Sequence, residues 1–187
     1  TTLFRSVWIL DPVDGTTNLI HDFRNSAVSL GLCDRGEMVC GVVYQPFTDE
    51  VFHAQKGKGA FLNRKPIHVS ASASMGESLI SIGTTPYEHA YADRNFAIFK
   101  KVFLDCQDIR RIGSAAIELC FVACGRLEAF FEMNLKPWDF AAGLLIIEEA
   151  GGTVTDFEGG RPLPWEKGNI VGSNGKIGRI LVEQYLN

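Results

Sequence analysis

The chain has 187 residues, of which 46% are hydrophobic and 21% are charged, and its formal net charge is −4. This acidic balance disfavours a nucleic acid or an acidic membrane surface as a partner, although a bound cation can still bring an anionic substrate to an acidic protein. No apolar run approaches the roughly 20 residues that cross a membrane, no signal peptide is recognisable, and the five cysteines form no CxxC pair, so we expect a cytoplasmic protein.

The first 70 residues have the pattern of consecutive β-strands. The apolar run over 6–10 stops at Asp11 and Pro12, and we expect this pair to end the strand. The tetrapeptide from Asp34 to Glu37 is rich in turn residues and predicts a hairpin. This half is therefore predicted to be an antiparallel sheet. Its expected strands are 6–10, 27–33, 38–46 and 50–55, followed by short strand-like pieces within 56–66.

From about residue 75, strands alternate with segments whose apolar residues recur at helical spacing. Such alternation is typical of a layered α/β sandwich, in which helices cover a sheet. We therefore predict two closely packed lobes, an N-terminal sheet lobe over 1–74 and an α/β lobe over 75–187. The expected strands of the second lobe are 78–83, 108–112, 127–133, 153–157 and 169–173, and its helices are 94–106, 114–124, 137–150 and 176–186.

The stretch "WILDPVDGTTNL" places several acceptor groups at the end of an apolar strand. Asp11 and Asp14 lie so close in sequence that their carboxylates repel, unless a cation offsets their charge. Carboxylates and a backbone carbonyl are the hard oxygen ligands that Mg²⁺ prefers, and Gly15 and Thr16 would offer backbone N–H groups to an anion. The alternative is that Asp14 is an ordinary helix cap and Asp11 a turn residue, and composition alone favours it.

A second acidic motif begins a predicted helix in "KPWDFAAG". Pro137 suits the first turn of a helix, and Asp139 lies in the same turn. An acid there is ordinary complementation of the helix dipole. The small residues Ala141 to Gly143, however, would let the helix approach a neighbour closely, as Asp139 must to reach Asp11 and Asp14.

Together, "WILDPVDGTTNL" and the downstream "WDFAAGLLIIEEAGG" resemble the inositol monophosphatase family of Mg²⁺-dependent phosphatases. The intervening "GVVYQPFTDEVFHAQKGKGAFLN" resembles the family's central sheet, so the resemblance covers essentially the whole chain. It implies a homodimeric phosphomonoesterase with two or three Mg²⁺ ions, in which water attacks phosphorus directly. The implied substrate is inositol monophosphate or a similar polyol phosphate. Related branches hydrolyse fructose 1,6-bisphosphate or 3′-phosphoadenosine 5′-phosphate, and a fold does not choose among them.

The resemblance also assigns metal ligands position by position. Asp11 matches the acid that bridges two metals, and the carbonyl of Val13 matches a ligand of the first metal. Asp14 and Asp139 match the acids that hold the second metal. The resemblance thus implies one catalytic group made of Asp11, Asp14, Thr16 and Asp139.

On the substrate side, the resemblance implies that backbone N–H groups bind the phosphate and that the Thr16 hydroxyl orients the attacking water. Ser114 is also a plain helix cap, and both roles are compatible. Glu132 matches an acid that binds substrate hydroxyls, with a solvent-facing strand end as the alternative. The matching positions are Gly15, Thr16, Gly113, Ser114, Ala115, Glu132 and Asp139 and, as a weaker match, Gly83 and Thr84.

One part of the family pattern lies outside these residues. The family has further acids upstream of the first aspartate motif, and one glutamate among them ligates the first metal and helps to activate water. Only ten residues precede Asp11. The interpretation we favour is a disordered N-terminal segment beyond the 187 residues. A true fragment is the alternative, and a non-catalytic phosphate- or metal-binding homologue would then be the rival to an enzyme.

Overall fold

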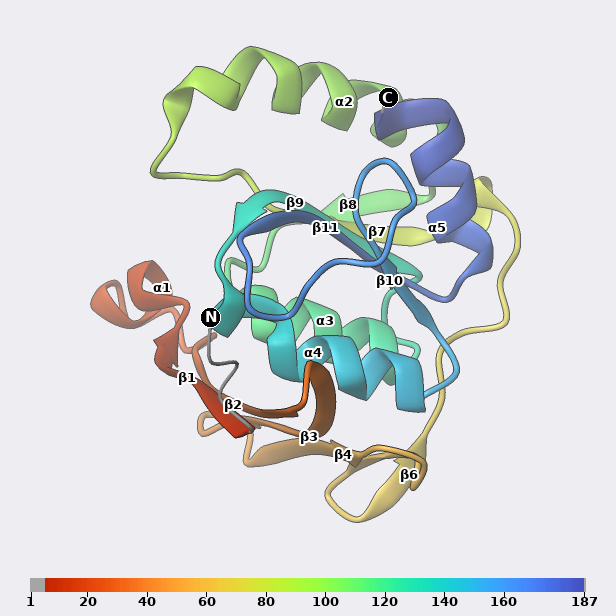
Figure 1. Ribbon diagram of the computed structural model, residues 1–187. Helices are drawn as coiled ribbons and strands as arrows, with labels where there is room; N and C mark the ends of the chain where they lie inside the picture. Colours follow the sequence, from red (N-terminus) through yellow and green to blue (C-terminus); the bar gives the residue numbers. More distant parts are fainter. Residues whose placement is uncertain (1–5, 187) are drawn as a thin grey trace.

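Two β-sheets alternate with two layers of helices in the computed structural model, which describes residues 6–186 (Figure 1). The predicted layered α/β sandwich is confirmed. Among residues 6–186, no helix combines the length and apolar character needed to cross a bilayer. The strands are β1 (Ser6–Asp14), β2 (Ala27–Asp34), β3 (Glu37–Gln45), β4 (Glu50–Gln55), β5 (Ala60–Leu62), β6 (Lys65–Ile67), β7 (Leu79–Ile82), β8 (Asp108–Arg110), β9 (Ala129–Leu135), β10 (Thr153–Thr155) and β11 (Gly168–Ser173). The helices are α1 (Thr16–Ile20), α2 (Ala92–Asp105), α3 (Ala115–Ala123), α4 (Pro137–Glu149) and α5 (Lys176–Leu181), with 3₁₀ turns at Met75–Glu77 and His89–Tyr91 and a π-helical segment at Val182–Leu186.

The first sheet is the predicted antiparallel one, with its six strands in the order β1-β2-β3-β4-β5-β6. The expected hairpin joins β2 to β3, and its central residues Arg35 and Gly36 have φ angles of 49° and 83°. Positive φ at both positions is the signature of a type I′ turn, whose twist matches that of the strands it joins. Strands β2 to β6 follow one another as consecutive hairpins, whereas α1 lies between β1 and β2.

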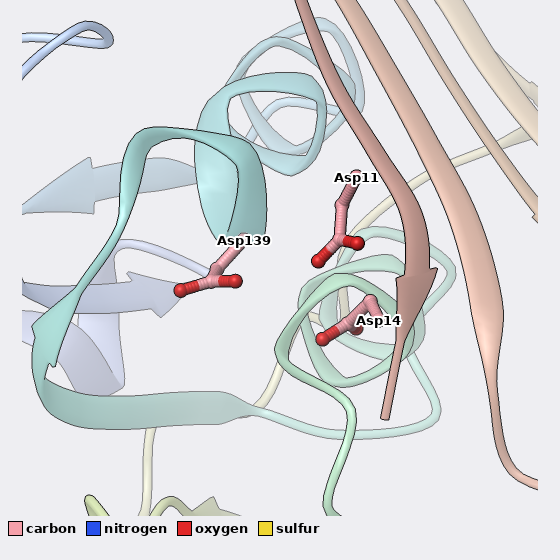
Figure 2. A group of neighbouring side chains, drawn as sticks. All are labelled: Asp11, Asp14 and Asp139. Carbon is pink, nitrogen blue, oxygen red and sulfur yellow. The ribbon is translucent and has the colours of Figure 1, made fainter. Parts of the chain in front are cut away.

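The prediction that Asp11 and Pro12 end the first strand is wrong, because β1 continues to Asp14. Among residues 6–186, β1 pairs with β2 alone and lies at the edge of the sheet, and Pro12 has no register partner in β2. Such a position tolerates proline, which has no N–H to donate. The pairing with β2 shifts between Asp11 and Asp14, as in a β-bulge. Residues three apart in a regular strand point to opposite faces, whereas a bulge inserts one residue and re-aims the side chains that follow it. Both aspartates can therefore face the helices (Figure 2).

The second sheet is mixed, with its strands in the order β10-β11-β9-β7-β8. β7 pairs in parallel with both β8 and β9, while β11 pairs antiparallel with β9 and β10. Helices α2 and α5 lie on its outer face in Figure 1. A second apolar cluster fills this outer layer and includes Phe99, Phe131 and Phe157.

Helices α3 and α4 lie between the two sheets and are buried on nearly all sides. α4 packs closely on the first sheet, since a Cβ atom at Gly41 would lie only 2.7 Å from the carbonyl oxygen of Ala142. On the opposite side, a Cβ at Gly143 would lie 2.7 Å from Cδ1 of Leu119 in α3. Small residues thus give α4 the close approach that the sequence predicts.

One apolar core joins the two expected lobes, because residues of the first sheet and of α3 and α4 belong to the same cluster. The expected boundary near residue 74 falls between β6 and β7. The division of the chain into domains 1–74 and 75–187 stays a prediction.

The other face of the first sheet is apolar and exposed. Trp8 is 62% exposed and Leu10 52%, and they pair across β1 and β2 with Leu32 and Leu30. In Figure 1 no described element covers this face. Exposed apolar area of this kind is unusual on a soluble monomer.

Candidate metal centre and cleft

Three carboxylates meet where β1 approaches the start of α4. Asp11 and Asp14 come from β1, and Asp139 comes from the first turn of α4 (Figure 2). One oxygen atom from each lies within 4.8 Å of the other two. Asp14 is buried, whereas Asp11 and Asp139 are half-buried. The structure therefore brings together the three acids that the sequence analysis singled out as metal ligands.

Local hydrogen bonds hold two of these acids and the predicted carbonyl ligand in place. Asp11 Oδ1 accepts a bond from the N–H of Val13 at 2.9 Å, and the Thr16 hydroxyl donates to the carbonyl of Val13 at 2.9 Å. Asp139 Oδ2 accepts from the N–H of Lys136 at 2.7 Å, which caps the start of α4. A carbonyl oxygen has two lone pairs, so the carbonyl of Val13 keeps one for a metal ion.

The buried Asp14 is held by the start of α3 rather than by its own strand. The Ser114 hydroxyl and the N–H of Ala116, the latter at 2.9 Å, both donate to its Oδ2 atom. Ser114 is also the N-cap of α3, accepting from the N–H of Ile117 at 3.4 Å. Of the three substrate-side residues expected here, Gly113 and Ala115 line the cleft, whereas the Ser114 hydroxyl is turned onto Asp14.

The three acids form an anionic cluster, in which the nearby charge of Lys136 partly opposes the rise in the pKa of Asp139. Burial raises the pKa of Asp14 to about 7 against the opposing bonds from Ser114 and Ala116, and the charges of Asp139 and Asp11 raise it further. Burial likewise raises the pKa of Asp139 to about 6, and the charge of Asp11 adds to the effect. Hard oxygen donors with unbalanced negative charge fit a divalent cation such as Mg²⁺. The residues present therefore fit the metal that the sequence predicts.

The acids border a cleft of about 530 Å³ that is also lined by β9 and by the loop after β7. Glu132 lies within β9 and is half-buried, so the alternative of a solvent-facing strand end is wrong. Its Oε1 atom accepts from the N–H of Thr85 at 2.9 Å, and burial raises its pKa to about 7. A Cβ atom at Gly83 would collide with the Glu132 carboxyl group. Glycine at 83 thus lets Glu132 lie across the end of β7.

The cleft-lining residues that sequence reasoning missed include Thr85, Arg111, Glu118 and Lys136. Glu118 is an acid within an otherwise apolar helix, and that contrast was a usable signal. Thr85 has a φ angle of 50°, which is strained for a β-branched residue, and no sequence pattern announces it. Arg111 donates to the Thr84 hydroxyl at 3.2 Å, and only the fold brings these two residues together.

The buried carboxyl groups predict how the stability of the metal-free chain depends on pH. Burial raises the pKa of Glu118 from 4.5 to about 8 and that of Glu132 to about 7. A carboxyl group whose pKa is raised on folding stabilises the folded state below its unfolded pKa, and this stability is lost as pH rises through the folded pKa. The free energy of unfolding in EDTA should therefore fall between about pH 4.5 and pH 8.

Thermal unfolding in EDTA measures this effect. We expect a midpoint at least about 5 °C higher at pH 5.5 than at pH 8, since 1 kcal/mol corresponds to about 2–4 °C in a chain of this size. The Glu118→Gln variant, which cannot ionise at this position, should show a smaller difference. Equal midpoints at the two pH values would contradict the assignment of neutral buried carboxyl groups.

The sequence and structure of the chain are similar to those of known proteins. The chain matches the model of the "Inositol monophosphatase family" over residues 3–186. It is 43% identical over 176 residues to an "Inositol-1-monophosphatase" of Rhizobium meliloti (strain 1021), covering 94% of this chain and 66% of that protein. It is 41% identical over 175 residues to a "Nus factor SuhB" of Salmonella typhimurium (strain LT2), covering 94% and 65%. The chain thus spans slightly less than two thirds of the length of these two relatives.

A solved structure is similar over nearly the whole chain. The crystal structure of the extragenic suppressor protein SuhB from Bartonella henselae has a TM-score of 0.92 and 40% identity. The match covers 98% of this chain and 69% of that one.

Proposed function

The chain belongs to the inositol monophosphatase family, and from this premise we propose that it is a Mg²⁺-dependent phosphomonoesterase. The proposed substrate is inositol monophosphate or a similar polyol phosphate, and the proposed setting is a cytoplasmic homodimer without a nucleic-acid or membrane partner. The meeting of Asp11, Asp14 and Asp139 within 4.8 Å, at the border of the cleft, is the observation that supports the proposal most.

The carboxylates of Asp11, Asp14 and Asp139 and the carbonyl of Val13 would hold the metal, as two or three ions. When bound, Mg²⁺ lowers the pKa of a water molecule and offsets the charge of the phosphate. The bond from Val13 N–H to Asp11 and the bonds from Ser114 and Ala116 to Asp14 keep these carboxylates oriented. Such preorganisation removes the need to reorient ligands during the reaction.

Thr16 orients the attacking water in this proposal. Its hydroxyl proton is committed to the carbonyl of Val13 at 2.9 Å, so its oxygen can only accept a bond from the water. As the first residue of α1, Thr16 also has a backbone N–H without a partner inside the helix. That N–H and the N–H of Gly15 are offered to the phosphate, and both residues line the cleft.

The leaving alcohol would lie toward Glu132. When ionised, its carboxylate accepts hydrogen bonds from hydroxyl groups of a polyol, while its Oε1 atom is held by Thr85. Among the described residues that line the cleft there is no Cys, Ser or His. Because the proposal assigns the three aspartates to the metal and the Thr16 hydroxyl proton is donated to the carbonyl of Val13, we propose direct attack by water rather than a covalent intermediate.

A panel of phosphate esters tests the proposal. Inositol 1-phosphate, fructose 1,6-bisphosphate and 3′-phosphoadenosine 5′-phosphate are assayed with Mg²⁺ and with EDTA. We expect turnover only with Mg²⁺, and a kcat/KM at least about tenfold higher for inositol 1-phosphate, the discrimination that about 1.4 kcal/mol provides. A preference for the nucleotide would reject the substrate assignment. Binding of Mg²⁺ without turnover of any ester would favour the non-catalytic homologue.

A further inference from the structure

The turn between β8 and α3 lies directly against the metal-binding motif. A Cβ atom at Gly15 would be 3.2 Å from the Cβ of Ser114 and 3.3 Å from the carbonyl oxygen of Gly113. The same turn leads into the two donors on Asp14, the Ser114 hydroxyl and the N–H of Ala116. The position of this turn therefore decides whether Asp14 keeps both bonds.

Asn18 fixes one side of that turn from within the metal-binding motif. Its side chain is buried, with 7% of the residue exposed. Its Nδ2 atom lies 2.9 Å from the carbonyl oxygen of Ile112 and 3.3 Å from that of Gly113, and it donates at 2.7 Å to the carbonyl of Asn25. One amide group thus links α1 to the β8–α3 turn.

Glu118, in α3, binds the backbone N–H of Ile112, the residue whose carbonyl accepts a hydrogen bond from Asn18. Its Oε1 atom accepts from the N–H of Ile112 at 3.1 Å and from the Ser81 hydroxyl of β7 at 2.7 Å. Only 1% of Glu118 is exposed, and the proposed reaction gives this buried acid no role. Ile112 follows β8, and two side chains from different elements hold its carbonyl and its N–H.

We propose that Asn18 and Glu118 are positioning residues for Asp14. Together they form a clamp on Ile112, and the clamp keeps the Ser114 hydroxyl and the Ala116 N–H on Asp14 Oδ2. The metal-related part of this inference rests on the proposed function, because it takes Asp14 as a metal ligand. The proposed effect of the clamp on the position of the β8–α3 turn does not rest on the proposed function.

Two readouts on the 187-residue chain separate positioning from general stability. The first is hydrogen exchange of the Ala116 amide in the metal-free chain, which reports the bond to Asp14. The second is the dissociation constant for Mn²⁺ as a probe ion, measured by electron paramagnetic resonance of the free ion. In Asn18→Ala and Glu118→Leu, we expect faster exchange at Ala116 and a dissociation constant raised about 10- to 100-fold, the usual cost of losing a group that orients a ligand.

The chain offers a matched control for each position. Asn174 is also 7% exposed and donates to Ser70 Oγ at 3.1 Å and to the carbonyl of Ser72 at 2.8 Å, so its amide group, unlike that of Asn18, does not bond to the β8–α3 turn. Asn174→Ala should lower the unfolding midpoint without changing either readout. Glu118→Gln keeps an acceptor oxygen for Ile112 and Ser81, so it should restore both readouts toward wild type. If Glu118→Leu does not fold, Glu118→Asp can replace it, because its side chain is one methylene shorter and its carboxylate lies farther from Ile112 and Ser81. It should show the same faster exchange at Ala116 and the same weaker Mn²⁺ binding.

A double-mutant cycle tests the route of the effect. If Asn18 acts through the contact between Ser114 and Asp14, adding Asn18→Ala to Ser114→Ala should weaken Mn²⁺ binding little further. If the double variant weakens Mn²⁺ binding by the product of the two single effects, the proposal is overturned. It is also overturned if Asn18→Ala and the Glu118 variants unfold at lower temperature but keep wild-type exchange at Ala116. A wild-type chain that binds no Mn²⁺ would count against the proposed function, while the exchange data would still decide the clamp.

Discussion

Asp14→Asn is expected to lower kcat at least about 10³-fold, at the upper end of the cost of removing one group that stabilises a transition state electrostatically. Asparagine keeps a carbonyl oxygen that can accept from the Ser114 hydroxyl and the Ala116 N–H, so the local fold should survive. It loses the negative charge that would hold the metal. Steady-state hydrolysis of inositol 1-phosphate at saturating Mg²⁺ measures the effect, and unchanged turnover would refute the metal assignment.

The same variant should separate metal binding from stability. Because Asp14 is buried with a pKa of about 7 and faces the charges of Asp11 and Asp139, a neutral amide removes an unfavourable charge from the metal-free chain. At pH 8 in EDTA, we expect an unfolding midpoint equal to or above that of wild type. The rise in midpoint on adding Mg²⁺, which follows from ligand linkage, should be lost. The exposed acid Asp22 is the control, and Asp22→Asn should keep both turnover and the response to Mg²⁺.

Gly41→Ala is expected to lower the free energy of unfolding by about 1–3 kcal/mol, the usual cost of overpacking a core. The added Cβ would lie 2.7 Å from the carbonyl oxygen of Ala142 and 3.2 Å from its Cα. These are backbone atoms, which cannot move aside without shifting α4. Because α4 carries Asp139, we also expect weaker Mg²⁺ binding. Urea unfolding and calorimetric titration with Mg²⁺ measure the two effects.

Gly76→Ala provides the matched control for Gly41→Ala. The nearest atom to its added Cβ is 3.8 Å away, and its φ is not in the left-handed region. Its stability should therefore stay within about 0.5 kcal/mol of wild type, as for ordinary surface substitutions. A loss equal to that of Gly41→Ala would show that the close packing of α4 is not the cause.

The sequence predicted the fold class and most elements because their periodicity is local. The antiparallel hairpins, the helices beginning near Ala115 and Pro137 and the alternation after residue 75 all follow from patterns a few residues long. The end of the first strand was mispredicted because its position in the sheet cannot be read from local sequence. Proline interrupts a strand only where its N–H is needed, and the position of β1 at the edge of the sheet is a tertiary fact.

Local sequence patterns indicate the residues that could bind a cation. These are two aspartates beside a glycine and a threonine, and a third aspartate in a first helical turn with small residues after it. Their meeting depends on the fold. The bulge between Asp11 and Asp14 lets both face the helices, and the close packing of α4 brings Asp139 to them. Only the fold revealed the clamp of Asn18 and Glu118, because hydrogen bonding between distant segments leaves no local pattern in a sequence.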